Sequence, residues 1–115
     1  MTPYLICTIK TYDVDWEVYI IDRDSPILST PTNRYSGITV NGEHRIYIED
    51  GLDKIFFKEV VYHEVTHAFN NSLNNSKLKF SHEELCDFIG RYGRNIYGQA
   101  ERIIRAERII RAYEK

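Results

Sequence analysis

Two histidines and a glutamate lie close together in the segment His63–His67, which reads HEVTH and has the form HExxH. In an α-helix, histidines four residues apart present their imidazoles on one face, so both can reach one Zn²⁺ at about 2.0–2.1 Å. Glu64 lies about 100° around the helix from His63, beside the open position of such a metal. There it can take a proton from a zinc-bound water, whose pKa the metal lowers to about 7. These residues predict metal-assisted hydrolysis.

The residues around this segment favour a metal over a pair of solvated histidines. Apolar side chains lie around most of the helix circumference: Phe56, Val60, Val61, Val65 and Phe69. This distribution predicts a buried helix, and two buried imidazoles and a carboxylate without a shared partner would be costly. The frequencies of His and Glu in this chain give a chance HExxH match about 1 time in 100.

An acidic segment further along the chain, Glu83–Asp87 (EELCD), supplies candidates for a third protein ligand. Glu83 and Asp87 are one helical turn apart, so one carboxylate can bind the metal while the other accepts the free N–H of a liganding histidine. Glu84 is the alternative ligand, although Ser81 and Glu84 also form the pattern of a capping box, which gives Glu84 another role. Cys86 is interpreted as a small buried apolar residue.

Hydrolysis also calls for a group that stabilises the oxyanion, and here the sequence leaves several candidates open. They are Tyr62, His82, Arg91 and Tyr92. His82 could alternatively bind the metal, but a residue in the first turn of a helix is more often solvated.

HExxH followed by ExxxD resembles the gluzincin pattern of thermolysin-like metallopeptidases, and residues 83–90 (EELCDFIG) match its second half. This resemblance implies that Glu83 is the third zinc ligand and that Asp87 is the partner of His63. The order of elements over residues 35–96, roughly half the chain, also resembles the small zincins of the ImmA/IrrE type. It is still more similar to their short phage- and prophage-encoded relatives. In that family the strand before the active helix borders the cleft, which implies that Ile46–Asp50 pairs with an extended peptide.

Residues 1–50 are predicted to be mainly strands. β-Branched and aromatic residues mark Tyr4–Ile9 and Trp16–Ile21 as two of them, and Arg23–Arg34, which contains two prolines, is predicted to be a loop.

The strongest local signal in this half is a hairpin. Tyr35–Val40 and Arg45–Glu49 flank Asn41-Gly42, a dipeptide suited to the positive-φ positions of a turn. The alternation of side chains predicts that four of them face the core: Ile38, Val40, Ile46 and Ile48.

Two helices are predicted to follow. Asp53 can cap the HExxH helix over residues 53–71, and Ser81 begins a second helix within residues 81–115. Gly90, Gly93 and Gly98 each weaken the second helix by about 1 kcal/mol relative to alanine, so we expect a bend there.

A direct repeat ends the second helix, where Ala100–Arg105 and Ala106–Arg111 both read AERIIR. Six residues advance a helix by 600°, so the second copy is turned by about 240° from the first. The predicted core stripe consists of Ile103, Ala106, Ile110 and Tyr113. Ile104 and Ile109 fall outside it. The repeat is either a short duplication that extends the helix or a face for self-association or a partner.

Composition limits the remaining alternatives. The 115 residues correspond to one domain, and a net charge of −2 gives no electrostatic argument for nucleic-acid or membrane binding. Two distant cysteines provide neither a disulfide framework nor a thiolate zinc site. The first ten residues lack the pattern of a signal peptide, so we expect a cytoplasmic protein, in the host cytosol if it is phage-encoded.

We therefore predict a single α+β, zincin-like domain over residues 1–115. A small, mostly antiparallel twisted sheet packs on the HExxH helix, and a glutamate-bearing helix follows. The predicted function is a zinc metallopeptidase acting on a peptide or protein, with Zn²⁺ held by His63, His67 and Glu83 and with Glu64 as general base. The alternative is a zinc-stabilised, non-catalytic module that regulates a host protein, but such a module need not retain Glu64. A metal-free structural protein is the third hypothesis.

Overall fold

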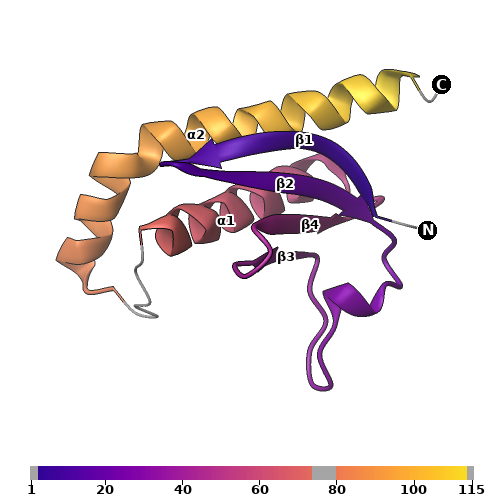
Figure 1. Cartoon of the computed structure of the whole chain (residues 1–115), viewed down its shortest axis with the longest axis horizontal. Coiled ribbons are helices and arrows are strands. Elements are labelled where there is room, and N and C mark those ends of the chain that lie inside the picture. Colours follow the sequence, from indigo (N-terminus) through magenta and orange to yellow (C-terminus); the bar gives the residue numbers. More distant parts are fainter. Residues whose placement is uncertain (1–2, 74–79, 114–115) are drawn as a thin grey trace.

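The computed structural model describes residues 3–73 and 80–113, which form the α+β arrangement expected from the sequence (Figure 1). Its strands and helices are β1 (Tyr4–Thr11), β2 (Val14–Ile21), β3 (Gly37–Val40), β4 (Arg45–Glu49), α1 (Lys54–Ser72) and α2 (His82–Tyr113). A short 3₁₀ helix, η1 (Pro26–Leu28), lies in the predicted loop. Neither α1 nor α2, nor any other helix within residues 3–73 and 80–113, combines the length and the hydropathy that a membrane span requires.

The four strands form one mixed sheet in the order β1-β2-β4-β3. The β1–β2 and β3–β4 pairs are antiparallel, as expected for neighbours joined by short turns. β2 and β4 pair in parallel because the chain from Asp22 to Ser36 crosses to the far edge of the sheet before β3 begins. β3 is therefore an edge strand, and β4 is paired on both sides.

One face of the sheet packs against both helices. Trp16, Val18 and Ile20 alternate along β2 and join the main core, where α1 contributes Val61 and Val65, both fully buried. On β4, this face is formed by Ile46 and Ile48. Full burial of one such aliphatic side chain contributes about 1.5–3 kcal/mol, so this layer holds α1 firmly against the sheet.

The opposite face carries a smaller core formed by Ile21, Leu28 and Tyr47. Ile38 and Val40 pack here, so the prediction that they share the main core with Ile46 and Ile48 is wrong. The cause is the β3–β4 connection, which has four residues and places Ile38 opposite Tyr47. Its positive φ falls on His44 (53°), and neither Asn41 nor Gly42 has one. A connection with an even number of residues, whether two or four, pairs each even-numbered residue of β3 with an odd-numbered residue of β4, so Ile38 cannot lie on the same face as Ile46.

The two predicted helices are present, and the second one is a single long element. α2 has 32 residues and includes both copies of the repeat, and Figure 1 shows it bent in its N-terminal half before it runs along β1. In the first copy, Ile103 and Ile104 are both buried, which corrects the expected exclusion of Ile104 from the core stripe. Tyr113 is 87% exposed and does not belong to that stripe.

Candidate metal centre

Helix α1 carries the HExxH segment and is fixed at both ends. At its start, the Asp53 side chain accepts a hydrogen bond from the Phe56 backbone N–H at 2.9 Å, which confirms the predicted cap. Near its end, the Ser72 hydroxyl donates to the Ala68 carbonyl and also contacts the Thr11 hydroxyl on β1. α1 is thus a rigid support for the residues between these ends.

His63 and His67 lie on one exposed flank of α1. Their Nε2 atoms are 3.2 Å apart, and their ring centroids are separated by 4.8 Å. Both side chains are exposed, so the expectation of two buried imidazoles is wrong. The apolar residues do not enclose the helix, because Phe56 is itself 41% exposed on this side.

The separation of the two Nε2 atoms tests whether a zinc ion fits this pair. Two nitrogens that each lie about 2.05 Å from a tetrahedral Zn²⁺ are about 3.3 Å apart. The observed 3.2 Å is close to that value, and it is also the length of a hydrogen bond between the two rings. The separation of the two nitrogens is therefore one that two ligands of a single tetrahedral metal would have.

Glu64 differs from the two histidines in being only 5% exposed. The Thr39 hydroxyl on β3 lies 2.7 Å from the Glu64 carboxylate oxygen Oε1 and 3.1 Å from the Glu64 backbone oxygen, so it is placed to donate to either. A Cβ on Gly37 would lie 3.0 Å from Glu64 Cγ and 2.6 Å from Val60 Cγ1. β3 therefore approaches α1 closely where it carries glycine, and its threonine holds the carboxylate in place.

These two residues of β3 were not identified as site residues from the sequence. Thr39 and Gly37 lie in the predicted strand Tyr35–Val40, but an alternating pattern does not show which helical residue faces each strand residue. The sequence did offer one signal, which is Gly37 itself. A glycine inside a strand often marks the place where another element approaches the backbone closely.

A pocket of about 350 Å³ opens between α1 and the chain that leads into β3. His63 and Glu64 line it on the helix side together with Phe56, and Tyr35 lines it on the other side. An open cavity therefore lies directly beside the carboxylate and one of the two histidines.

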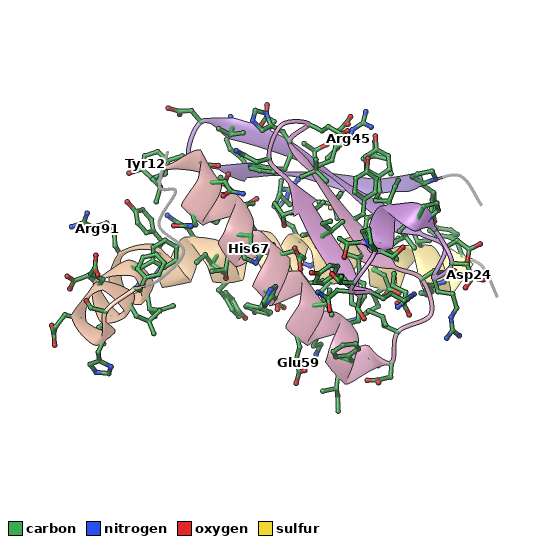
Figure 2. All side chains as sticks on the ribbon, turned by 90° about the horizontal axis from the view of Figure 1, so that it is seen from below. Tyr12, Asp24, Arg45, Glu59, His67 and Arg91 are labelled. Atoms are coloured by element: carbon green, nitrogen blue, oxygen red, sulfur yellow. The ribbon has the colours of Figure 1, made fainter. Side chains whose placement is uncertain are left out.

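The predicted third ligand lies on a different element. Glu83 is exposed in the first turn of α2, and Figure 2 shows the early part of this helix, which carries Arg91, set apart from the part of α1 that carries His67. Over residues 3–73 and 80–113, no group of three or more His, Cys, Asp or Glu side chains is placed to hold a metal. The structure thus brings His63, Glu64 and His67 together but leaves Glu83 and Asp87 apart from them. The roles of these two acidic residues stay predictions.

The start of α2 is capped as predicted. The Ser81 backbone N–H donates to Glu84 Oε1 at 3.0 Å, and the Glu84 N–H donates to the Ser81 hydroxyl at 3.1 Å. This reciprocal pair occupies Glu84, the alternative ligand. Cys86 is exposed rather than buried, with its sulfur 3.8 Å from His82 Nε2, so its interpretation as a buried apolar residue is wrong.

The aromatic candidates for an oxyanion donor are engaged elsewhere. The Tyr62 hydroxyl donates to Glu101 Oε2 at 3.0 Å and joins α1 to α2. The pKa of Tyr62 is raised to about 12, mainly because the side chain is partly buried and secondly because of this hydrogen bond. Tyr92 contacts the Tyr12 hydroxyl at 3.5 Å. Each of these two hydroxyls thus already has a partner other than the histidine pair.

The strand that borders this site is not the one implied by the resemblance. Ile46–Asp50 covers most of β4, which is paired with β2 and β3 and has no edge available to a peptide. β3 is the edge strand, and Thr39 places it directly against Glu64. A peptide that adds to this side of the sheet would therefore pair with β3.

Comparison of the chain with protein families, with curated proteins and with solved structures found no match.

Proposed function

We propose that this protein is a zinc-dependent metallopeptidase. The observation that carries the proposal is the histidine pair, whose Nε2 atoms are 3.2 Å apart next to a buried glutamate. His63 and His67 would hold the metal, and Glu83 is the proposed third protein ligand. A zinc ion bound there would supply a Lewis acid and lower the pKa of a water molecule that it binds.

In this proposal the residues of the chain have separate tasks. Glu64 takes the proton of the attacking water and passes it to the leaving amine. The Thr39 hydroxyl holds the Glu64 carboxylate in one orientation, so no rotamer search precedes proton transfer. β3 binds the substrate as an added strand, and the pocket beside Phe56 and Tyr35 receives one of its side chains.

The proposal requires one rearrangement. Because Glu83 does not join the histidine pair among the described residues, its carboxylate has to move toward the pair when the metal binds. The bent N-terminal half of α2, which carries Glu83, is the element that this movement involves (Figure 1).

Zinc titration of protein prepared without a His-tag tests the ligand assignment. We expect one Zn²⁺ per chain and a loss of affinity in H63A, H67A and E83Q. H82A and E84Q remove the two alternative ligands that the sequence offers, and each should bind zinc as the unmodified chain does; a loss of affinity in either one would reassign the third ligand. A chain that binds no zinc, or that binds it equally well as H63A, contradicts the proposal.

A proteome incubated with the zinc-loaded protein then reports on hydrolysis. New peptide N-termini that disappear when a chelator removes the metal support peptidase activity. A host protein that binds the zinc-loaded chain and is recovered intact would instead identify the non-catalytic module.

A further inference from the structure

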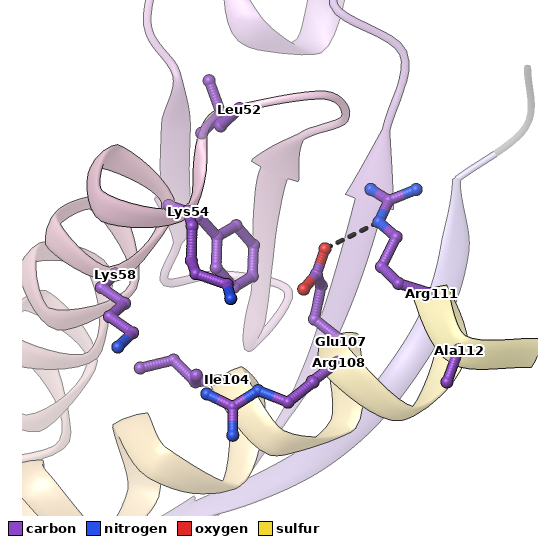
Figure 3. Close-up of a pocket in the computed structure, with 9 residues that line it drawn as sticks. Leu52, Lys54, Lys58, Ile104, Glu107, Arg108, Arg111 and Ala112 are labelled. Carbon is purple, nitrogen blue, oxygen red and sulfur yellow. Dashed lines mark hydrogen bonds and ion pairs between the residues drawn. The ribbon is translucent and has the colours of Figure 1, made fainter.

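A second pocket, of about 360 Å³, lies between the first turns of α1 and the last turns of α2 (Figure 3). Lys58 lines it, and His63 lies five residues later, about 140° around the helix. The pocket thus opens on a different flank of α1 from the histidine pair. The interior is apolar, formed by Leu52, Phe57 and Ile104, of which the last two are 6% and 5% exposed.

Basic side chains surround this apolar interior. Figure 3 shows Lys54 and Lys58 from α1 and Arg108 from α2 extending into the same space between the helices. None of these three forms an ion pair with another residue of the described part of the chain.

The acidic residue at this pocket does not neutralise that charge. Glu107 Oε2 lies 2.7 Å from Arg111 Nε, and Arg111 also pairs with Asp50 at 2.5 Å. These contacts hold Glu107 against Arg111 at one side of the pocket, as the dashed line in Figure 3 shows. The remaining cations repel one another until an anion lies between them.

We propose that this pocket binds a small apolar carboxylate. The carboxylate lies between Lys54, Lys58 and Arg108, and the apolar part of the ligand fills the interior next to Phe57 and Ile104. A purely inorganic anion would leave the apolar interior exposed to water, and an uncharged apolar ligand would leave three cations without a counter-ion. Only a ligand with both parts complements both features of the pocket.

This site gives the AERIIR repeat a physical role. Ile104, from the first copy, forms part of the apolar interior, whereas the second copy supplies Arg108 and Arg111 to the walls. The second copy is turned by about 240° around the helix axis relative to the first copy. The second copy therefore presents charged side chains to the start of α1, whereas the first copy presents an isoleucine. The two copies of the six-residue sequence thus form different parts of one pocket.

Calorimetric titration of the full chain with octanoate tests this proposal. We expect octanoate to bind more tightly than acetate, which lacks the apolar part, and more tightly than octylammonium, which has the wrong charge. Its affinity should fall as salt is added, because the cations are partly exposed. The double variant K58Q/R108Q should lose at least about tenfold in octanoate affinity, since its charge-assisted contacts are removed.

K10Q/R94Q is the matched control, because it removes one lysine and one arginine from outside this pocket. It should bind octanoate as the unmodified chain does. The proposal is overturned if octanoate binds no more tightly than octylammonium, or if K58Q/R108Q and K10Q/R94Q lose affinity equally. It is also overturned if acetate binds as well as octanoate. All of these substitutions are at exposed positions, so each variant should fold.

Discussion

Replacing Thr39 by valine removes the side-chain hydroxyl that holds the Glu64 carboxylate, with little change in side-chain shape. The Thr39 Oγ1 to Glu64 Oε1 distance is 2.7 Å, and Glu64 is 5% exposed, so water has little access to replace the lost donor. A hydrogen bond to a charged group contributes about 1.5–3 kcal/mol. We expect T39V to lower the free energy of unfolding by that amount.

Two further variants separate the hydrogen bond from the packing. T39S keeps the hydroxyl and loses a half-buried methyl group, so it should cost less than about 1 kcal/mol. In an E64Q background the acceptor is neutral, and the cost of T39V should fall to about 0.5–1.5 kcal/mol. The difference between the two backgrounds measures the coupling of Thr39 to the charge of Glu64.

Urea unfolding followed by tryptophan fluorescence provides the measurement. Trp16 is the single tryptophan and is fully buried, so its emission reports loss of the core. Equal costs for T39V and T39S, or an unchanged cost of T39V in the E64Q background, would refute the assignment of Thr39 as the residue that holds the carboxylate.

Three other predictions concern single residues. G37A should lose about 1–3 kcal/mol of stability in urea unfolding, because its Cβ would lie 2.6 Å from a side-chain carbon of α1. G42A has nothing within 4 Å and should change stability by less than about 0.5 kcal/mol; equal losses would contradict the close approach of β3. Since burial and a hydrogen bond raise the pKa of Tyr62 from 10.0 to about 12, its contribution to stability is complete below pH 10 and is lost as the pH rises through 12. Alkaline unfolding curves should show a smaller loss in Y62F, and identical curves would contradict this. Finally, mass spectrometry after brief iodoacetamide treatment should find exposed Cys86 modified before Cys7, whose pKa burial raises to about 11; the reverse order would refute this exposure difference.

The features that the sequence predicts correctly are local ones. Asp53 caps α1, and Ser81 and Glu84 form the capping box of α2, because each depends on residues within one helical turn. The HExxH spacing places His63 and His67 on one face for the same reason. Helix periodicity requires no knowledge of the rest of the fold.

The features that the sequence does not predict depend on distant packing. Glu64 is held by Thr39, 25 residues earlier, only because the β3 edge lies against α1. The mixed sheet arises from the chain crossing between β2 and β3, which leaves no periodic signal. The face on which Ile38 lies is instead a local feature, because any connection with an even number of residues places Ile38 opposite an odd-numbered residue of β4, here Tyr47.

The exposure of the histidine pair is also not predicted by the distribution of apolar residues along α1. Apolar residues around α1 predict burial on all sides, but Phe56 lies on the open flank and lines the pocket beside Glu64. An apolar residue next to such a site can be exposed in order to contact a substrate. The prediction of burial assumed instead that every apolar residue of α1 faces the core.

The most direct test of the metallopeptidase proposal compares peptide hydrolysis by the unmodified chain and by E64Q at equal zinc occupancy. Glutamine keeps the size of Glu64 and can still accept the Thr39 hydrogen bond, but it cannot take a proton. We expect E64Q to bind one zinc with unchanged affinity and to lose hydrolysis by a factor of about 10² or more. Hydrolysis at the same rate in E64Q, with the zinc site intact, would contradict the proposed role of Glu64 and with it the proposed mechanism.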